Sequence, residues 1–195
     1  MGPPWKIQFL QDVIRQHRPD LMFVCEMLSN SKKMKRVRSR TGFQGMLTVE
    51  AQGRSGGITL LWKDQIHVSL LSMPNNHIDV VISIPDMQIK RLTGFYGEPN
   101  RSQRRRTWEL LRNLSRENNL PWCIIGDMKN ILQQEDKKGG MLYPQWLLDD
   151  FNDTIEEAGL NDLELHGHQF TWERGRGTYN WVEIRLDRAL ALKSV

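Results

Sequence analysis

The sequence is poor in cysteine, which limits how the fold can be held together. Its 195 residues include only Cys25 and Cys123, each within an apolar run. A small secreted domain stabilised by disulfides would carry more cysteines, so we expect two reduced thiols in the core, with a single bridge as the less favoured alternative. Two cysteines alone also supply too few ligands for a metal site.

Long apolar runs are missing as well. No stretch approaches the roughly 20 residues that a membrane-spanning helix needs. The opening residues, MGPPWKIQFL, do not follow the cationic and then apolar pattern of a secretory signal. We therefore expect an intracellular protein, nuclear or cytoplasmic, with no membrane partner. Repeats and low-complexity segments are also lacking, so the length indicates one domain over residues 1–195. The oligomeric state stays open.

Positive charge is present in excess and is clustered. The formal net charge is +4, with six lysines and arginines in residues 31–40 and four arginines in residues 101–106. A one-sided basic surface suits a polyanion such as nucleic acid. A solvated helix face would carry the same charges, and charge alone does not separate these two interpretations.

Four segments are expected to be helical. Apolar residues at three- and four-residue steps predict the first helix, which should end before Pro19. The third helix, capped by Asn100 or Ser102, should bury its apolar residues Trp108, Leu111 and Leu114. The predicted helices are 5–17, 31–40, 103–117 and 143–158, the last ending at Gly159.

Strand-like runs outnumber the helices. Turn residues separate several runs rich in β-branched residues, so antiparallel pairing of neighbours is the simplest arrangement. One sheet with one covered face could not bury them all, whereas two packed sheets could. We therefore predict an α/β fold, a four-layer sandwich of two mostly antiparallel sheets with helices outside. The predicted strands are 20–27, 46–51, 57–62, 66–73, 77–84, 89–97, 121–127, 162–165, 169–173 and 181–190.

Four oxygen-bearing residues stand at the ends of predicted strands: Glu26, Tyr96, Asp127 and Asp187. A cluster of hard oxygen ligands at such a place suits Mg²⁺. A single strand-end acid is common and signifies little, and spacing alone does not prove that the four converge.

Several segments resemble a known family when they are taken in order: RPDLMFVCEML, GGITLLWKD, GFYGEPNRSQRRRTWELL, PWCIIGDMKNIL, LNDLELHGHQFTW and RLDRAL. Together they resemble the endonuclease/exonuclease/phosphatase superfamily, and within it most closely the endonuclease domain of plant LINE-type (non-LTR) retrotransposons. The resemblance covers nearly the whole chain. It implies a DNase I-like four-layer sandwich, a retrotransposon origin and Mg²⁺-dependent cleavage of nucleic-acid phosphodiesters.

The resemblance assigns roles to the strand-end residues. Glu26 matches the metal-binding glutamate, and Tyr96 the tyrosine that faces the scissile phosphate. Asp127 matches the aspartate that orients or activates the attacking water, and Asp187 the acid that orients a catalytic histidine. Each has a plainer alternative: a solvated acid for Glu26, a packing role for Tyr96 and pairing with a neighbouring arginine for Asp187. Asp127 is the position where the functional interpretation is favoured.

A basic set completes the expected site. Arg101, Arg104, Arg105 and Lys129 are predicted to contact the phosphates of nucleic acid, with DNA as the expected partner.

The chain also departs from the family pattern. The resemblance implies an opening strand with a metal-binding Asn and a closing Ser-Asp-His segment, and neither is found here. Where relatives have Gly-Asp-x-Asn, Lys129 takes the place of the Asn, and Asn130 comes one residue late, on the other face of a strand. Lys129 could attract a phosphate, repel Mg²⁺ or neutralise Asp127. We therefore expect a fold incomplete at both termini and impaired catalysis, with a non-catalytic nucleic-acid-binding or vestigial domain as the alternative.

Overall fold

The computed structural model describes residues 4–27, 31–50 and 57–192. The chain forms two compact units, Met1–Gly94 and Phe95–Val195, which we call the N-terminal and C-terminal units. The organisation as a single domain over residues 1–195 stays a prediction.

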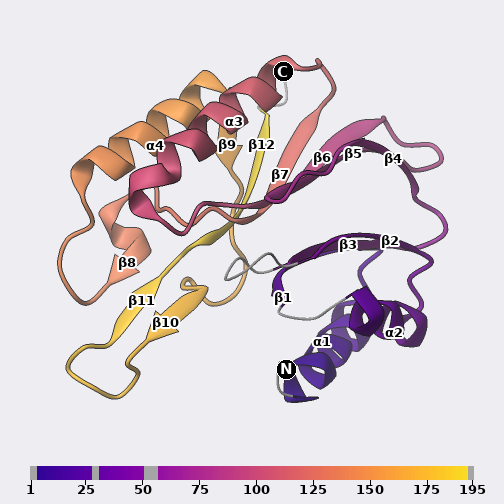
Figure 1. Cartoon of the computed structure of the whole chain (residues 1–195), viewed down its shortest axis with the longest axis horizontal. Helices are drawn as coiled ribbons and strands as arrows, with labels where there is room; N and C mark the ends of the chain where they lie inside the picture. Colours follow the sequence, from indigo (N-terminus) through magenta and orange to yellow (C-terminus); the bar gives the residue numbers. More distant parts are fainter. Residues whose placement is uncertain (1–3, 28–30, 51–56, 193–195) are drawn as a thin grey trace. The chain divides into compact units, whose positions relative to one another are not determined.

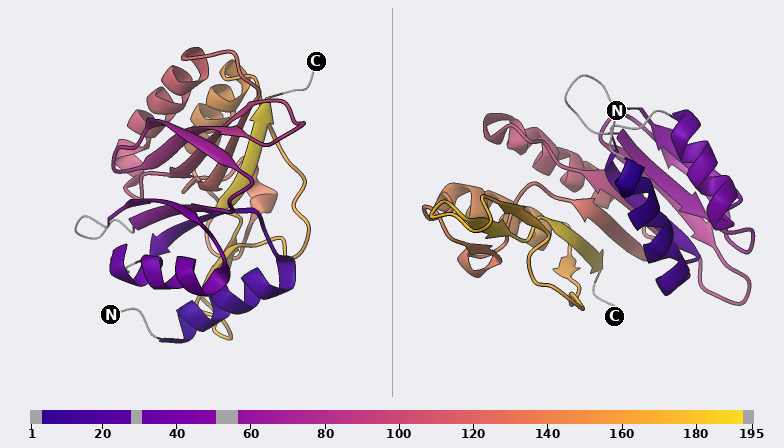
Figure 2. Two further views of the ribbon diagram at one scale, coloured as in Figure 1. Left: turned by 90° about the vertical axis from the view of Figure 1, so that its right-hand side faces the viewer. Right: turned by 90° about the horizontal axis from the view of Figure 1, so that it is seen from below.

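A three-stranded sheet with two helices on one face opens the N-terminal unit (Figure 1). The other two views show the same helices against that face (Figure 2). Both outer strands pair antiparallel with the central one, in the order β1-β3-β2. The elements are α1 (Pro4–His17), β1 (Leu21–Met27), α2 (Ser31–Thr41), β2 (Gly45–Val49) and β3 (Gly57–Trp62).

Apolar residues at helical spacing explain why these helices cover the sheet. Met34 and Val37 lie one turn apart on α2 and are buried with Ile14 of α1 and Leu61 of β3. Each side chain of this kind contributes about 1.5–3 kcal/mol when it is fully buried. Among the described residues of α2, Lys35, Arg36, Ser39 and Arg40 are exposed, so part of its basic run lies on the surface.

A second layer of strands lies in the same unit. It has the order β4-β5-β6, with β4 (His67–Ser72) paired antiparallel to β5 (His77–Ser83). Strand β6 (Lys90–Tyr96) runs across the boundary between the units. Residues of β3 contact β5, and a side chain at Gly94 would collide with the ring of Phe23 in β1. The two layers of strands therefore pack closely, which only a glycine at residue 94 permits.

The C-terminal unit has a sheet in the order β7-β12-β9, whose strands pair antiparallel. Helices α3 and α4 lie side by side over one face of it (Figures 1 and 2). The ring of Trp108 stacks on Phe151 with centroids 4.6 Å apart, which joins the two helices. The elements are α3 (Arg104–Arg116), β7 (Trp122–Asp127), α4 (Gln145–Glu157), β9 (Leu160–Asp162) and β12 (Asp187–Leu192).

A smaller sheet completes this unit, in the order β10-β11-β8. Strands β10 (Trp172–Arg174) and β11 (Val182–Ile184) form a hairpin that extends away from α3 and α4 (Figure 1). Strand β8 is Lys137–Lys138, and two short 3-10 turns are η1 (Arg101–Gln103) and η2 (Gln134–Asp136).

The four helices lie where the sequence predicts them, and the prediction that Trp108, Leu111 and Leu114 are buried is confirmed. Asn100 does form a cap, but of η1, since its Oδ1 accepts a hydrogen bond from the Ser102 backbone at 3.1 Å. Helix α3 begins after Gln103 without a side-chain cap.

Two strand predictions near the end of the chain are wrong. The predicted strand 162–165 is replaced by β9, which ends at Asp162. The single run 181–190 is divided into β11 and β12. At the break the backbone N–H groups leave the ladder: Arg185 donates to the Asp136 carbonyl at 2.8 Å, and Leu186 donates to Thr171 Oγ1 at 3.0 Å.

Two further findings concern the cysteines and the question of a membrane-spanning helix. Cys25 and Cys123 are both thiols, and each is partly buried. Over the part of the chain that the structure describes, none of the helices has the length and apolar character to cross a membrane.

Candidate functional site

Asp127 ends β7 as a buried carboxylate, with 5% of its surface exposed. Its partner across the antiparallel pair is Asp187, the first residue of β12. Side chains directly opposite each other in such a pair have Cβ atoms about 4.5–5.5 Å apart. The sheet of the C-terminal unit thus brings two predicted site residues together.

Tyr96 joins them from the end of β6. The next residue, Gly97, donates its backbone N–H to the Asp127 carbonyl at 2.7 Å. A side chain at Gly97 would collide with the Met128 carbonyl, so this approach requires glycine. Tyr96, Asp127 and Asp187 therefore lie close together in the C-terminal unit, while the predicted site of four residues and their chemical roles stay predictions.

Lys129 holds the carboxylate of Asp127 at both oxygens. Its Nζ lies 2.6 Å from Oδ2, and its backbone N–H donates to Oδ1 at 2.9 Å. The same Nζ lies 4.8 Å from the centroid of the Tyr96 ring, a cation–π distance. The pair is nearly buried, with side-chain exposures of 12% for Lys129 and 7% for Asp127. A lysine thus supplies the charge that faces the carboxylate.

The backbone of Lys129 is unusual too. Its φ of +54° lies in the left-handed region, which costs a non-glycine residue roughly 1–2 kcal/mol and which Asn tolerates better than most. The conformation curls the chain back, so that one residue meets Asp127 with both its N–H and its side chain.

Asp187 is positioned by a residue that the sequence analysis did not single out. Its backbone N–H donates to Thr171 Oγ1 at 3.0 Å, and the preceding N–H does the same. The neighbouring arginines bind Asp162: Arg185 at 3.1 Å and Arg188 at 2.5 Å. The signal that could have found Thr171 is its place in QFTW, just before the short strand β10.

Glu26 lies in the N-terminal unit, near the end of β1, and is exposed. Its φ is +57°, within a register shift between Val24 and Met27. A left-handed glutamate is strained, and such outliers gather at functional sites. The strain singles out Glu26 as a candidate, and its role as a metal ligand stays a prediction.

The predicted phosphate-binding arginines lie in different environments. Arg101 and Arg105 are exposed; Arg101 lies over the ring of Tyr143 at 5.4 Å, and Arg105 pairs with Asp150 at 3.1 Å. Arg104 is 7% exposed, and it donates to Asn130 Oδ1 at 3.2 Å and to the Tyr143 hydroxyl. Arg104 therefore joins α3 to the interior in this structure, and its contact with nucleic acid stays a prediction.

Burial governs the ionisation of this interior pair. It lowers the pKa of Arg104, and the hydroxyl of Tyr143 partly offsets the effect. It raises the pKa of Tyr143, which Arg104 opposes. Asn130 completes the network: its Oδ1 accepts from the Tyr143 hydroxyl at 2.6 Å and its Nδ2 donates to the Leu147 carbonyl at 2.7 Å. The side-chain amide of Asn130, which directly follows Lys129, is thus engaged in the interior.

The residues around Asp127 do not fit a bound Mg²⁺ in this arrangement. Mg²⁺ binds oxygen ligands, but both carboxylate oxygens of Asp127 are engaged by Lys129. An ammonium about 4 Å from a divalent cation would be repelled by up to roughly 8 kcal/mol at an effective dielectric of about 20. Within residues 4–27, 31–50 and 57–192, no three His, Cys, Asp or Glu side chains form a group that could hold a metal ion.

Solved structures share this fold at low sequence identity. The endonuclease domain of TRAS1, a telomere-specific non-LTR retrotransposon, is 16% identical with a TM-score of 0.71, covering 98% of this chain and 81% of its own. The 3′ phosphatase NExo from Neisseria, solved with a product DNA hairpin, is 13% identical (TM-score 0.67, 97% and 82% covered). An AP endonuclease from Archaeoglobus fulgidus is 16% identical (TM-score 0.67, 95% and 80% covered).

No curated protein matches the chain significantly. The sequence profile of the Endonuclease/Exonuclease/phosphatase family matches residues 5–191. The profile and the structural likeness confirm the predicted superfamily, the predicted DNase I-like α/β fold and the similarity to a retrotransposon endonuclease. The chain belongs to the Endonuclease/Exonuclease/phosphatase family.

Proposed function

We propose that this chain is a retrotransposon-derived phosphodiesterase domain that acts on nucleic acid, with hydrolysis far below that of an intact family site. The observation that carries the proposal is the ion pair between Lys129 Nζ and Asp127 Oδ2 at 2.6 Å. We expect Asp127, at the end of β7, to orient or activate the attacking water, and this pair occupies its carboxylate.

Three features support nucleic acid, and DNA in particular, as the substrate class. The family profile matches nearly the whole chain. Similar structures include a retrotransposon endonuclease, an AP endonuclease and a phosphatase solved with a DNA hairpin. The exposed arginines Arg101, in η1, and Arg105, in the first turn of α3, can meet a phosphate backbone. An intracellular location, nuclear or cytoplasmic, accords with that substrate.

The Asp127–Lys129 pair lowers catalysis through charge. Asp127 Oδ2 already faces the Lys129 ammonium and Oδ1 accepts from its backbone N–H, so fewer lone pairs are left to hold an attacking water. The same ammonium offers a positive charge to an incoming phosphate, so binding can persist where hydrolysis is suppressed.

A second candidate function follows from the same pair. If Lys129 stays on Asp127 when nucleic acid binds, the domain binds without turnover. The basic surface then supplies the affinity, which falls steeply with salt.

Plasmid nicking in Mg²⁺ buffer tests the proposal. We expect the wild-type chain to relax supercoiled plasmid about 10²–10⁴-fold more slowly than the TRAS1 endonuclease domain, as expected when an acid–base group is compromised. Asp127→Ala should abolish the remaining activity. The matched control is Asp153→Ala, which removes an exposed carboxylate from α4 and should leave the rate unchanged.

Nicking as fast as that of the TRAS1 domain, or residual nicking that survives Asp127→Ala, would contradict the proposal. Salt-sensitive DNA binding with no nicking by any variant would select the second candidate instead.

A further inference from the structure

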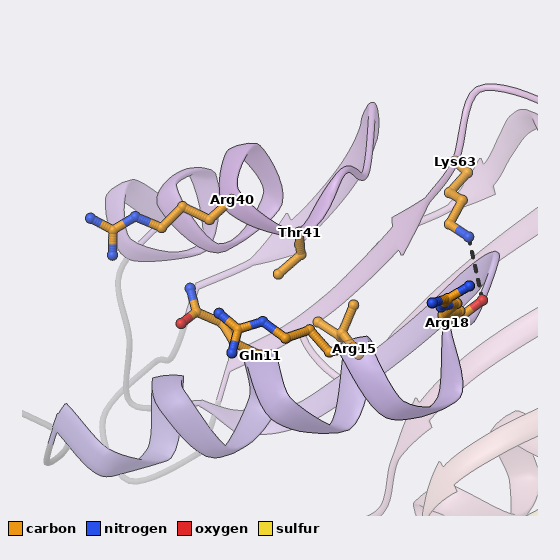
Figure 3. A pocket seen from close by; sticks show the side chains of 7 residues that line it. Gln11, Arg15, Arg18, Arg40, Thr41 and Lys63 are labelled. Atoms are coloured by element: carbon orange, nitrogen blue, oxygen red, sulfur yellow. Dashed lines mark hydrogen bonds between the residues drawn. The ribbon is translucent and has the colours of Figure 1, made fainter.

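A basic pocket of about 340 Å³ opens between α1 and α2 in the N-terminal unit (Figure 3). Four of its seven lining residues are cations and none is an acid. Cations concentrated in one hollow attract anions. The lining residues are Gln11, Ile14, Arg15, Arg18, Arg40, Thr41 and Lys63.

Two of the four cations are already compensated. Arg15 pairs with Asp12 at 3.1 Å, and Lys63 pairs with Asp20 at 2.8 Å. The guanidinium groups of Arg18 and Arg40 make neither an ion pair nor a hydrogen bond with any other residue that the structure describes, and both residues are exposed. The pocket therefore presents two positive charges that a ligand can take up.

The backbone at Arg18 gives independent support. Arg18 follows the last residue of α1, its N–H donates to the Ile14 carbonyl at 2.8 Å, and its φ is +45°. This is the left-handed position at a helix C-terminus, where glycine is the common residue. Glycine would adopt this conformation with less backbone strain than arginine. The strained arginine therefore indicates a role for its side chain.

The surface next to the pocket is basic as well. Lys35, Arg36 and Arg40 of α2 are exposed. Exposed cations beside the pocket can add contacts to a polyanionic backbone. A single small anion would use only the pocket, whereas a nucleic-acid backbone would use both.

The pocket is separate from the predicted metal-binding position. Asp20, which holds Lys63, directly precedes β1, and Glu26 stands five residues beyond the start of that strand. At about 3.3 Å per residue the two ends are about 17 Å apart. A ligand in the pocket would not occupy the place of Glu26.

We propose that this pocket binds a nucleic-acid backbone, with Arg18 and Arg40 each contacting a separate phosphate at opposite ends of the pocket. The pocket would be a second contact site for nucleic acid, separate from Glu26. This proposal rests on the proposed function only in taking nucleic acid as the ligand. Figure 3 shows Arg40 on α2 and Arg18 just beyond α1 at opposite ends of the view, so each would meet a different phosphate of one backbone.

Fluorescence anisotropy with a labelled DNA duplex of about 20 base pairs tests this in EDTA, where hydrolysis plays no part. The double variant Arg18→Gly/Arg40→Ala should lower the slope of log affinity against log salt by about 1.8, that is, about 0.9 per phosphate contact. Between about 50 and 200 mM salt, wild-type affinity should then fall about tenfold more than the variant's.

The control is Lys90→Ala/Arg116→Ala, which removes two exposed cations elsewhere and should keep the wild-type slope. Arg18→Gly suits the left-handed backbone, so loss of folding will not explain an effect. A pocket variant with the wild-type slope would overturn the proposal. A second result would also overturn it. Inorganic phosphate would raise the melting temperature of the wild type but not of the pocket variant, while the salt dependence of DNA binding would be the same in both proteins. Because no cleavage is measured, failure here leaves the Asp127 nicking test unaffected.

Discussion

Left-handed backbone occurs at several residues for which a role is proposed in this chain. Among the described residues, the non-glycine positions with positive φ are Arg18, Glu26, Asp86 and Lys129. Three of the four carry the candidate chemistry: Arg18 lines the basic pocket, Glu26 is the predicted metal ligand and Lys129 holds Asp127. Strain of this kind persists only where the surrounding structure holds the residue in place, and such residues cluster at functional sites. Arginine, glutamate and lysine are not enriched at positive φ, so the sequence gives no local signal for it at Arg18, Glu26 and Lys129.

The site residues differ in how far sequence could predict them. Tyr96 and Asp127 end apolar strands and Asp187 begins one, and the family resemblance singled out all three, although spacing alone could not prove that they converge. The engagement of Asp127 by Lys129 depends on a side-chain rotamer and a φ value, so the sequence left it as one of three alternatives. The burial of Arg104 was not predicted, because a basic run at the start of a helix usually indicates solvent-exposed side chains. Only the hydrogen bonds with Asn130 and Tyr143 reveal its interior position.

His77 supplies a pH prediction. It is buried, hydrogen-bonded to Ser72 Oγ at 2.9 Å and to Asn76 Oδ1 at 3.1 Å. Burial lowers the pKa of His77 below 6.5, although Asp79 opposes the shift. The unfolded chain takes up a proton near pH 6.5 while the folded chain resists it, so stability is complete above that pH and falls as pH drops below it.

Urea unfolding at pH 7.5 and pH 5.5 measures this effect. We expect the wild type to lose stability on acidification and His77→Gln to lose less of it. An equal loss in both proteins would show that His77 is not the group responsible.

At the scale of elements, periodic helices were the easiest to predict. The spacing of apolar residues in α3 was sufficient to predict that Trp108, Leu111 and Leu114 are buried. The short strands of the C-terminal unit were harder, because β10 and β11 have only three residues each. Their ends are set by side-chain and loop contacts, such as that of Thr171 with Leu186, which no local pattern contains.

The pairing of β5 with β6 contains a buried ion pair. Arg91 Nη2 lies 2.7 Å from Asp79 Oδ2, Arg91 Nε lies 3.0 Å from both carboxylate oxygens, and Thr93 Oγ1 donates to Oδ1 at 2.6 Å. Removing one partner of such a pair leaves a buried charge uncompensated. We expect Asp79→Ala to lower the free energy of unfolding by about 3–5 kcal/mol.

Chemical denaturation of matched variants checks this. Asp12→Ala removes the exposed partner of Arg15 in the same unit and should cost less than about 1 kcal/mol. The double change Asp79→Leu/Arg91→Met should be less harmful than Asp79→Ala, since it removes both charges. A loss below about 1 kcal/mol for Asp79→Ala would contradict a stabilising role for the pair between β5 and β6.

At the scale of the whole molecule, membership of the Endonuclease/Exonuclease/phosphatase family accounts for the fold, and one substitution within it accounts for the proposed function. The ordered segments were sufficient to predict the family because they span the chain. They were not sufficient to predict activity, because activity depends on which group faces Asp127. In this chain that group is an ammonium.

The most direct test of this account is the initial rate of plasmid nicking by Lys129→Asn in Mg²⁺ buffer. Asn suits the left-handed backbone and removes the ammonium from Asp127 Oδ2, so we predict a rate about tenfold or more above the wild type, lost again on adding Asp127→Ala. Lys138→Asn, at an exposed lysine that faces Glu183, is the matched control and should change nothing. A folded Lys129→Asn protein that nicks no faster than the wild type would contradict the claim that Lys129 suppresses hydrolysis.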